Sequence, residues 1–377
     1  MNCHYYQAGA CRSCTLIQTP YSQQLASKQE KAQQLLVPWP SVSWHPPVAS
    51  AQEDFRNKAK LVVTGSSQQP KLGILGPKFE GQDLRDCPLY TPQIRQAIPV
   101  LEELIRRAKL TPYSVAQKKG ELKNILVTSS DRGQLMVRFV LRSKKLLVAI
   151  RSQLDWLQGQ LPQLEVVSIN LLREHVALVE GPEEIILTQA KTLPMQVGGL
   201  TLHLRPQSFF QTNTAIASAL YQRGASWVKQ VAPASLWDLY CGVGGFALFA
   251  AQQLGPDSRV TGIEISTEAI ASAQRTVAEA GLSGIDFIAQ DATSYALESG
   301  QVPQMLVMNP PRRGIGQQLA QWVEASGIEQ VVYSSCNVES FAKDLAAMPS
   351  YRPVEGQVMD MFPHSSHFEA IFRLERI

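Results

Sequence analysis

The rhythm of apolar and polar residues changes twice along this chain. Residues 20–36 carry apolar positions at helical spacing and predict one amphipathic helix, which ends at the proline-rich stretch 37–47. From about Phe55 to Leu204, short alternating runs are separated by turn residues, a pattern typical of an antiparallel β-rich domain. The predicted strands are 59–65, 71–76, 124–130, 134–143, 166–172, 176–181, 184–188 and 200–206, with one helix at 94–110.

From about Pro206 onward, strand-like and helix-like segments alternate. The predicted strands are 235–240, 259–265, 285–291, 305–311 and 330–335, with helices at 244–254 and 268–281. Two further strands, 355–362 and 367–377, are joined by a turn at 363–366. Short apolar strands that alternate with helices favour a doubly wound α/β domain, here with an antiparallel finish. We therefore predict one part at 1–205 and a second at 206–377.

Composition narrows the class of protein without naming a partner. Hydrophobic residues make up 45% of the chain and charged residues 18%, as in ordinary globular proteins. The formal charge of +3, from 35 basic and 32 acidic residues, neither requires nor excludes nucleic acid. No apolar run approaches the roughly 20 residues of a membrane span, and the first residues lack the order of a signal peptide. We expect a cytoplasmic protein without membrane contact, whose six cysteines serve metal binding or catalysis.

A glycine-rich turn at Gly242 follows the first strand of the α/β part and predicts a cofactor pocket. Glu264 closes the next strand about 20 residues later, where a carboxylate can accept hydrogen bonds from ribose hydroxyls. Asp291 ends the third strand, within reach of an adenine edge, and Asn309 ends the fourth. The G-x-G-G spacing and the lack of a phosphate-binding Lys-Ser/Thr pair argue against nicotinamide dinucleotides and ATP.

The motif Asn309-Pro310-Pro311-Arg312 resembles the Asn/Asp-Pro-Pro-aromatic motif of enzymes that methylate exocyclic amines of bases. In those enzymes the aromatic residue stacks on the flipped base. Here an arginine occupies that position, which argues against amine methylation.

Cys336 follows the next strand and is a candidate nucleophile. A buried cysteine after an apolar strand is usually inert, and we expect Cys241, inside the glycine turn, to pack in that way. Cys336 differs because it lies at the cofactor edge, beside the strand that ends in Asn309. The C5 atom of uracil is too weak a nucleophile to take a methyl group from a sulfonium. A thiolate that adds to C6 activates C5, which attacks the methyl group before a base removes the C5 proton.

The base that this chemistry needs has three candidates near the end of the chain, His364, His367 and Glu369. Histidine titrates near neutral pH, and a carboxylate can act there if burial raises its pKa. The residues alone leave this choice open.

Four cysteines form a second candidate site. Cys3, Cys11 and Cys14 give C-x7-C-x2-C, and Cys87 precedes Pro88 as a distant fourth ligand. Four thiolates suit either a structural zinc ion or a [4Fe–4S] cluster, and the spacing does not decide between them.

Basic residues recur in the β-rich part and predict a surface that holds RNA phosphates. The alternative is that each group is an ordinary solvated face. The residues are Arg56, Lys58, Lys60, Lys118, Lys119, Lys123, Arg138, Arg142, Lys144 and Lys145.

Several segments together resemble the bacterial RNA uracil-5 methyltransferase family from end to end. They are the four-cysteine pattern, Phe-Arg-Asn-Lys at 55–58, Arg-Pro-Gln-Ser-Phe-Phe-Gln at 205–211, DLYCGVGGF at 238–246, NPPRRG at 309–314, SSCN at 334–337 and HFE at 367–369. The resemblance implies a class I, Rossmann-like, S-adenosylmethionine-dependent methyltransferase domain, together with a β-rich RNA-binding domain and an N-terminal iron–sulfur motif. The chain most resembles members that modify 23S ribosomal RNA. This resemblance implies that 23S ribosomal RNA is the partner.

The resemblance also implies roles for individual residues. It places a [4Fe–4S] cluster on the four cysteines, makes Cys336 the nucleophile and makes Glu369 the base. Cofactor contacts are implied for Gln211, Tyr240, Glu264 and Asn309, and the family's usual residue at the last position is aspartate. Relatives further suggest that residues 21–54 pack on the catalytic domain.

Three other functions stay open. A transfer RNA uracil-5 methyltransferase shares the same chemistry, a base-amine methyltransferase would use the NPPR motif, and an iron–sulfur RNA-binding protein would retain the fold without catalysis. No protein partner is implied, so we expect a monomer.

Overall fold

The computed structural model describes residues 1–176 and 178–377, which divide into two compact units. Unit 1 comprises Met1–Cys14, Ala51–Gln196 and Arg205–Gln207. Unit 2 comprises Thr15–Ser50, Val197–Leu204 and Ser208–Ile377. The helix expected at 20–36 is therefore part of unit 2, although unit 1 precedes and follows it in the sequence.

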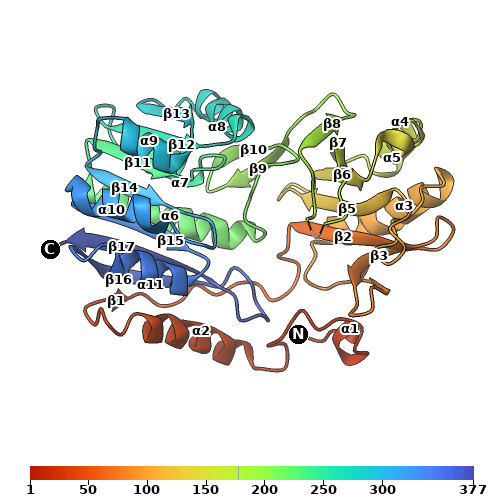
Figure 1. Cartoon of the computed structure of the whole chain (residues 1–377), viewed down its shortest axis with the longest axis horizontal. Helices are drawn as coiled ribbons and strands as arrows, with labels where there is room; N and C mark the ends of the chain where they lie inside the picture. Colours follow the sequence, from red (N-terminus) through yellow and green to blue (C-terminus); the bar gives the residue numbers. More distant parts are fainter. Residues whose placement is uncertain (177) are drawn as a thin grey trace. The chain divides into compact units, whose positions relative to one another are not determined.

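Unit 2 is built on an eight-stranded sheet with the order β1-β16-β17-β15-β14-β11-β12-β13 (Figure 1). The strands are β1 (Ser43–Trp44), β11 (Ser235–Leu239), β12 (Arg259–Glu264), β13 (Ile285–Ala289), β14 (Met305–Met308), β15 (Gln330–Ser335), β16 (Tyr351–Met359) and β17 (Glu369–Arg376). The helices are α2 (Tyr21–Leu35), α6 (Thr214–Val231), α7 (Gly245–Ala251), α8 (Thr267–Ala280), α9 (Ala292–Glu298), α10 (Gly316–Ser326) and α11 (Val338–Ala346), and β10 (Leu200–Leu204) also lies in this unit.

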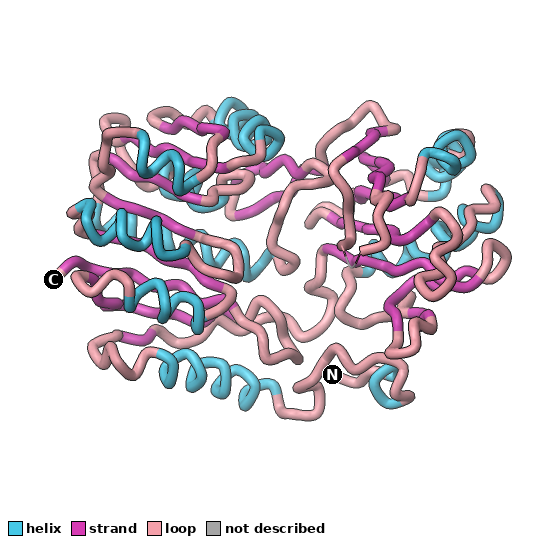
Figure 2. Tube along the Cα trace, viewed as in Figure 1, coloured by secondary structure: helices cyan, strands magenta, loops and turns pink. Residues whose placement is uncertain are grey.

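Helices cover both faces of this sheet. Helices α2, α9, α10 and α11 pack apolar residues into one core with the strands, which includes Val323, Phe341 and Leu306. The Phe341 and Phe372 rings stack with centroids 4.3 Å apart, which joins α11 to β17. In Figure 1, α9, α10 and α11 lie in front of the sheet and α6 and α7 behind it, and Figure 2 shows the same strands side by side between helices. The predicted doubly wound α/β domain is confirmed.

The strand directions decide where loops of unit 2 meet. Strands β11 to β15 run parallel to one another, so their carboxyl ends share one edge of the sheet. Strand β17 runs antiparallel to β15, with Ser335 opposite Ala370, so it begins at that same edge. The predicted antiparallel finish is thus confirmed. The strand order reverses between β11 and β14, and open α/β sheets bind ligands at such a switch point.

Within the described residues, unit 1 contains a seven-stranded sheet with the order β4-β3-β2-β5-β6-β7-β8. Its strands are β2 (Lys58–Gly65), β3 (Pro70–Leu75), β4 (Gly81–Asp83), β5 (Leu122–Ser129), β6 (Leu135–Leu141), β7 (Leu164–Leu171) and β8 (Glu183–Ile186), and β9 (Leu193–Val197) follows them. The helices are α1 (His4–Gln7), α3 (Pro92–Arg107), the 3-10 turn η1 (Lys144–Leu146), α4 (Leu147–Arg151) and α5 (Leu154–Gln160).

Two expectations for unit 1 were wrong. Strands β6 and β7 pair in parallel because η1, α4 and α5 carry the chain across before it returns, whereas an antiparallel pair needs only a tight turn. The strand expected at 176–181 is absent from the described residues of that range, and residue 177 lies outside them. There the Asn170 amide exchanges hydrogen bonds of 2.6 and 2.8 Å with the Gly181 backbone, which replaces strand pairing.

Across the described chain, no helix combines the length and apolar character needed to cross a membrane.

Candidate active site

The predicted site residues of unit 2 gather at the carboxyl edge of its sheet. Tyr240 follows β11, Glu264 ends β12 and Asn309 follows β14. Cys336 follows β15, and Glu369 is the first residue of β17. Because all these strand ends share one edge, residues spread over about a third of the sequence, from Tyr240 to Glu369, come together there.

The glycine turn after β11 has the backbone conformation that its composition predicts. Gly242 and Gly244 have φ angles of 56° and 87°, and Tyr240 adopts the same left-handed region at 65° although it is not glycine. The Glu264 carboxylate accepts hydrogen bonds from the Gly242 and Ser266 amides at 3.2 and 3.0 Å. A side chain added at Gly242 would meet nothing within 4 Å. Open space therefore lies beside the turn, where the expected cofactor would bind.

Asp291 caps the helix that leads away from β13. Its carboxylate accepts a hydrogen bond from the Ser294 amide at 2.9 Å. Burial raises the pKa of Tyr240, and a hydrogen bond with Thr293 opposes this shift. The charge of Asp291 also raises the pKa, which indicates that the Tyr240 hydroxyl lies near Asp291. Tyr240 and Asp291 thus border the same part of the edge.

A buried carboxyl that the sequence analysis did not single out lies below the glycine turn. Asp238, in β11, is fully buried, and one of its oxygens accepts the Ala247 amide at 2.8 Å. Its other oxygen has no hydrogen-bond partner among the described residues. Burial raises the pKa of Asp238 to about 8, with the charge of Glu264 adding to the shift. Nothing in the sequence indicated this buried carboxyl, because strand periodicity does not indicate whether a polar residue within an apolar strand has a partner.

Cys336 and Glu369 lie close enough to influence each other. Burial raises the pKa of Glu369 to about 7, against a hydrogen bond of 3.2 Å from the Ser334 hydroxyl. Cys336 is half-buried, and burial followed by the charge of Glu369 raises the pKa of its thiol, while Arg312 opposes the shift. Two acidic groups in one partly dry site resist being ionised together.

The loops that carry Asn309 and Cys336 are tied to each other. The Asn337 amide donates to the Arg312 carbonyl at 3.3 Å, and the Ser335 hydroxyl accepts the Asn337 backbone amide at 3.0 Å. The NPPR and SSCN motifs therefore form one structural unit, although a strand and a helix separate them in the sequence.

Asp344 in α11 holds the same loops, and it is a second residue that the sequence pattern did not indicate. One of its oxygens accepts the Ile315 amide at 2.9 Å and the Tyr333 hydroxyl at 2.6 Å. Gly314 has a φ of 86°, and a Cβ there would lie 2.3 Å from that oxygen. The glycine of NPPRRG is thus required by the close approach of Asp344, which no spacing in the sequence indicates.

Gln211 is buried two residues before Asn213, whose side chain caps α6 by accepting the Ile216 amide at 3.3 Å. Further along α6, Tyr221 is buried with its ring centroid 5.0 Å from that of Phe246. Burial and then the charges of Asp238 and Glu369 raise the pKa of Tyr221. Tyr221 therefore lies near both buried carboxyl groups, a position that only the packing of α6 on the sheet creates.

The three candidate bases have different surroundings. His364 is fully buried, and its Nδ1 lies 3.3 Å from the Gln24 amide nitrogen of α2. His367 is exposed. Of the three, Glu369 is the one whose charge acts on Cys336.

The four cysteines of unit 1 line one pocket together with Leu84. Burial raises the pKa of Cys14 to about 12, and the charges of the three other thiols add to the shift. Across the described residues, no group of three or more His, Cys, Asp or Glu side chains is arranged to hold a single metal ion.

Some basic residues expected to face RNA serve the interior of unit 1 instead. Arg138 is 2% exposed and pairs with Glu180 and Glu184. Lys123 is buried, bonds to the Glu174 carbonyl and lies over the Tyr113 ring. These two contacts are internal, which corrects the expectation for Arg138 and Lys123.

Comparison with known families settles what this arrangement belongs to. The model of the tRNA (Uracil-5-)-methyltransferase family matches residues 20–377. The chain belongs to this family. The resemblance stated from the motifs is thereby confirmed.

Curated relatives agree over the whole length. The chain is 47% identical to the 23S rRNA (uracil(747)-C(5))-methyltransferase RlmC of Pectobacterium carotovorum subsp. carotovorum (strain PC1), over 377 residues and all of both chains. It is 48% identical to the enzyme of the same name from Serratia proteamaculans (strain 568), again over all of both chains.

A solved structure agrees in fold. The Pyrococcus abyssi tRNA (uracil-54, C5)-methyltransferase, in complex with S-adenosyl-L-homocysteine, matches with a TM-score of 0.79 and 24% identity, over 96% of this chain and 85% of that one. The chain thus has the mixed α/β fold of S-adenosylmethionine-dependent methyltransferases.

Proposed function

We propose that this protein methylates C5 of a uridine in 23S ribosomal RNA, of the type numbered 747 in its relatives, using S-adenosylmethionine. Two full-length relatives with nearly half of their residues identical carry that name and support the substrate. The observation that carries the chemistry is the approach of Cys336 to Glu369 at the edge of the sheet.

Cys336 is the proposed nucleophile. Its thiolate adds to C6 of uracil, and the electron pair of the C5–C6 double bond moves onto the enolate, which makes C5 nucleophilic. Arg312, which lowers the pKa of this thiol against burial, supports formation of the thiolate. S-adenosylmethionine supplies the electrophilic methyl group that C5 takes.

Glu369 is the proposed base. After methylation, C5 carries both a methyl group and a proton, and the carboxylate removes that proton as the C6–S bond breaks. This step restores the aromatic ring and frees Cys336. A carboxyl group with a pKa of about 7 is suited to this task, because it is partly ionised near neutral pH and basic enough to accept a proton.

The cofactor side of the site is the turn around Gly242. We propose that Glu264 accepts hydrogen bonds from the ribose and that Asp291 and Tyr240 border the adenine. Asn309 and Gln211 would contact the end of the cofactor that carries the methyl group. The open space beside Gly242 and the position of Tyr240, Glu264, Asp291 and Asn309 at or just after strand ends along one sheet edge support this arrangement.

Among the alternatives, a transfer RNA substrate would use the same residues, so only the RNA distinguishes it. A base-amine methyltransferase is disfavoured because Arg312 replaces the stacking aromatic residue of that motif. A protein without catalysis would not need the carboxyl of Glu369 near the half-buried thiol of Cys336.

We propose that unit 1 recognises the RNA and that its four cysteines bind a [4Fe–4S] cluster. A cluster places each thiolate on a different iron atom, which is a different demand from binding one ion. The shared pocket and the mutual effect of the thiols on the pKa of Cys14 support the four residues as one ligand set.

Anaerobic purification followed by iron and sulfide analysis tests the cluster. We expect iron and sulfide in equal amounts and absorption near about 400 nm, both lost in Cys14→Ser. A colourless protein that contains zinc would contradict this part of the proposal.

The function is tested with unmodified 23S ribosomal RNA and transfer RNA transcripts, labelled S-adenosylmethionine, and nucleoside analysis of the products. We expect 5-methyluridine at one position of the ribosomal transcript. A transcript containing 5-fluorouridine should trap the protein covalently, since fluorine at C5 cannot leave as a proton does. Digestion should locate the adduct on the Cys336 peptide.

Other products would refute the proposal in distinct ways. Methylation of transfer RNA alone would shift the substrate to the runner-up function. N6-methyladenosine, or a trapped adduct on Cys241, would reject the C5 mechanism through Cys336.

A further inference from the structure

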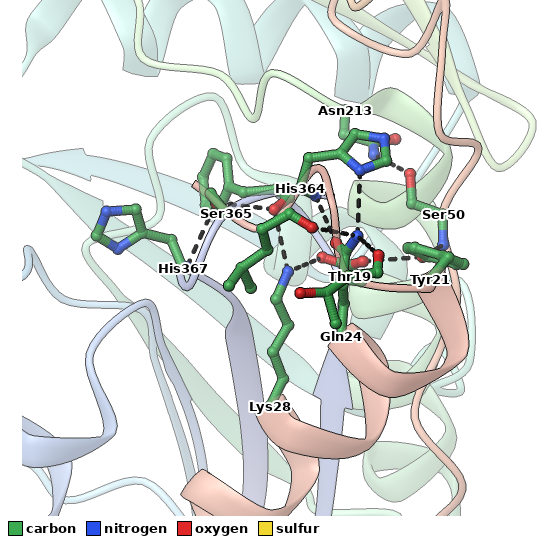
Figure 3. Close-up of polar contacts among 12 residues, drawn as sticks. Thr19, Tyr21, Gln24, Lys28, Ser50, Asn213, His364, Ser365 and His367 are labelled. Carbon is green, nitrogen blue, oxygen red and sulfur yellow. Dashed lines mark hydrogen bonds and ion pairs between the residues drawn. The ribbon is translucent and has the colours of Figure 1, made fainter. Parts of the chain in front are cut away.

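The turn that leads into Glu369 is held by residues from the other end of the chain. Residues 360–368 connect β16 to β17, and α2 packs beside them within unit 2. Figure 3 shows the side chains of Gln24 and Lys28 pointing from α2 toward this turn, with His367 directed away from them.

An ion pair fixes the start of the turn. Lys28 Nζ lies 2.6 Å from an oxygen of Asp360, and the two side chains are 2% and 0% exposed. Lys28 also donates to the Phe362 carbonyl at 3.0 Å, and the Tyr21 hydroxyl donates to the other Asp360 oxygen at 2.8 Å (Figure 3). All these contacts are buried or partly buried, so water cannot easily replace any of them.

Gln24 fixes the middle of the turn. His364 has a φ of 63°, a left-handed conformation that a non-glycine residue keeps only where its surroundings enforce it. Its backbone amide donates to the Gln24 side-chain oxygen at 2.9 Å, and its carbonyl accepts the Leu16 amide at 2.9 Å. The Gln24 amide in turn donates to the Leu16 and Thr19 carbonyls at 3.0 and 2.8 Å. The strained residue is therefore bound on both sides by the N-terminal segment.

The same segment reaches a second part of the site. The Ser50 amide donates to the Tyr21 hydroxyl at 2.7 Å, and the Asn213 side chain donates to the Ser50 hydroxyl at 2.7 Å (Figure 3). Asn213 caps α6 two residues after Gln211. One hydrogen-bond network thus holds both the turn that precedes Glu369 and Asn213, which lies two residues after Gln211.

We propose that Lys28 and Gln24 are positioning residues for Glu369, which hold the turn 360–368 so that its carboxylate reaches the C5 proton. This inference rests on the proposed function. Within the described residues, Lys28 and Gln24 form hydrogen bonds with the turn and not with Cys336 or Glu369, so they act through the turn.

Stability alone does not account for a charged pair at this place. Replacing a buried ion pair with apolar residues is often neutral or stabilising, so such a pair is weak support for folding. Ala32 of α2 and Leu36, the residue after this helix, already pack in the apolar core. What the pair and Gln24 add is a defined geometry for the residues that precede Glu369.

The test compares Lys28→Met with Lys31→Met. Both replace a lysine of α2, but Lys31 is 52% exposed and lies 3.8 Å from an exposed Glu339. Removal of the C5 proton follows methyl transfer, so a misplaced base should trap methylated RNA on Cys336. For Lys28→Met we expect release of 5-methyluridine RNA to fall by up to about 100-fold, the size of effect that a displacement of about 1 Å produces. The covalent adduct should accumulate, S-adenosylmethionine binding should persist, and Lys31→Met should match wild type.

A loss of product without adduct, or an unchanged rate, would overturn the inference. If Lys28→Met does not fold, the double variant Lys28→Met with Asp360→Leu removes both charges and leaves no unpaired one. Adduct accumulation in the double variant supports positioning, and its absence overturns it. Wild type that forms no 5-methyluridine, or Glu369→Gln that traps no adduct, would instead reject the proposed function itself.

Discussion

The sheets of the two units use polar residues in opposite places. In unit 2, the proposed reacting groups Cys336 and Glu369 lie where strands end, although the carboxyl of Asp238 is buried within β11. In unit 1, polar groups occupy the middle of strands, where Arg138, Ser168 and Asn170 are buried. The proposed role of Cys336 and Glu369 is to react with a ligand. Arg138 and Asn170 instead form an ion pair and hydrogen bonds with other residues of unit 1. The location of a polar residue along a strand thus separates chemistry from architecture in this protein.

The physical reason lies in strand direction. Parallel strands bring their carboxyl ends to one edge, where loops replace backbone pairing and side chains can reach a ligand. Polar residues in mid-strand are surrounded by neighbouring strands, and most groups buried there need hydrogen-bonded partners, as Arg138 and Asn170 have. Substitutions at strand ends of unit 2 should therefore affect catalysis, and substitutions in mid-strand of unit 1 should affect stability.

The largest effect is expected at the strand end occupied by Cys336. Cys336→Ala should lower the rate of 5-methyluridine formation at least roughly a thousandfold, as for other covalent nucleophiles, because no other group can form the C6 adduct. Methyl transfer from labelled S-adenosylmethionine measures this. Equilibrium binding of the cofactor serves as the control and should stay within about threefold. Substantial residual methylation would break the assignment of chemistry to this edge.

Glu369→Gln comes next, with an outcome that depends on pH. The variant should accumulate the covalent protein–RNA adduct, seen as a shifted band after denaturing electrophoresis. In wild type, only the ionised carboxylate can accept the C5 proton, so product release should fall as pH drops through about 7. A pH profile that is flat across this range would contradict the role of Glu369.

The same carboxyl group has a stability effect of known sign. Its pKa is higher in the folded state than in the unfolded chain, so its contribution to stability is present at low pH and lost as pH rises through about 7. Glu369→Gln, which cannot ionise, should therefore gain stability relative to wild type above that pH. Thermal melts at several pH values measure the difference.

A smaller and purely structural effect is expected from the mid-strand position Arg138. Arg138→Met should reduce the free energy of unfolding by about 3 kcal/mol, because Glu184, which is only 11% exposed, is left without its partner. Denaturant titration measures this. Arg106→Met is the control, since Arg106 and Glu103 are 37% and 46% exposed and such a pair contributes at most about 1 kcal/mol. Equal losses in both variants would remove the distinction between buried and exposed pairs in unit 1.

The smallest effect concerns RNA contacts of unit 1. Lys60 is exposed on β2 and alternates with the core residue Leu61, so it faces away from the helices that cover the other side. Lys60→Ala should weaken RNA binding a few-fold and reduce the salt dependence by about one released ion. Lys109→Ala, an exposed position just after α3, should leave both quantities unchanged. A matching loss at Lys109 would indicate that net charge, not the face of the sheet, determines binding.

The sequence alone predicted the secondary structure of the α/β unit and most of its candidate site residues. Apolar spacing predicted the strands and helices of the α/β unit, because burial between helices demands short apolar strands. Cys336 was a candidate nucleophile from the sequence because it follows a strand at the cofactor edge, beside the strand that ends in Asn309. The choice of Glu369 over His364 and His367 rested on family resemblance, since all three can act as a base.

The tertiary structure decided what sequence spacing cannot express. Asp344 and Tyr221 lie within helices whose pattern is ordinary, and only packing brings them to the glycine of NPPRRG and to the buried carboxyl groups. The parallel pairing of β6 with β7 depends on a helical crossover that alternation does not reveal. Lys28 and Asp360 are separated by 332 residues, yet they form one buried pair. Periodicity reports which side of an element is buried, while the partner against which it is buried is set by the fold of the whole unit.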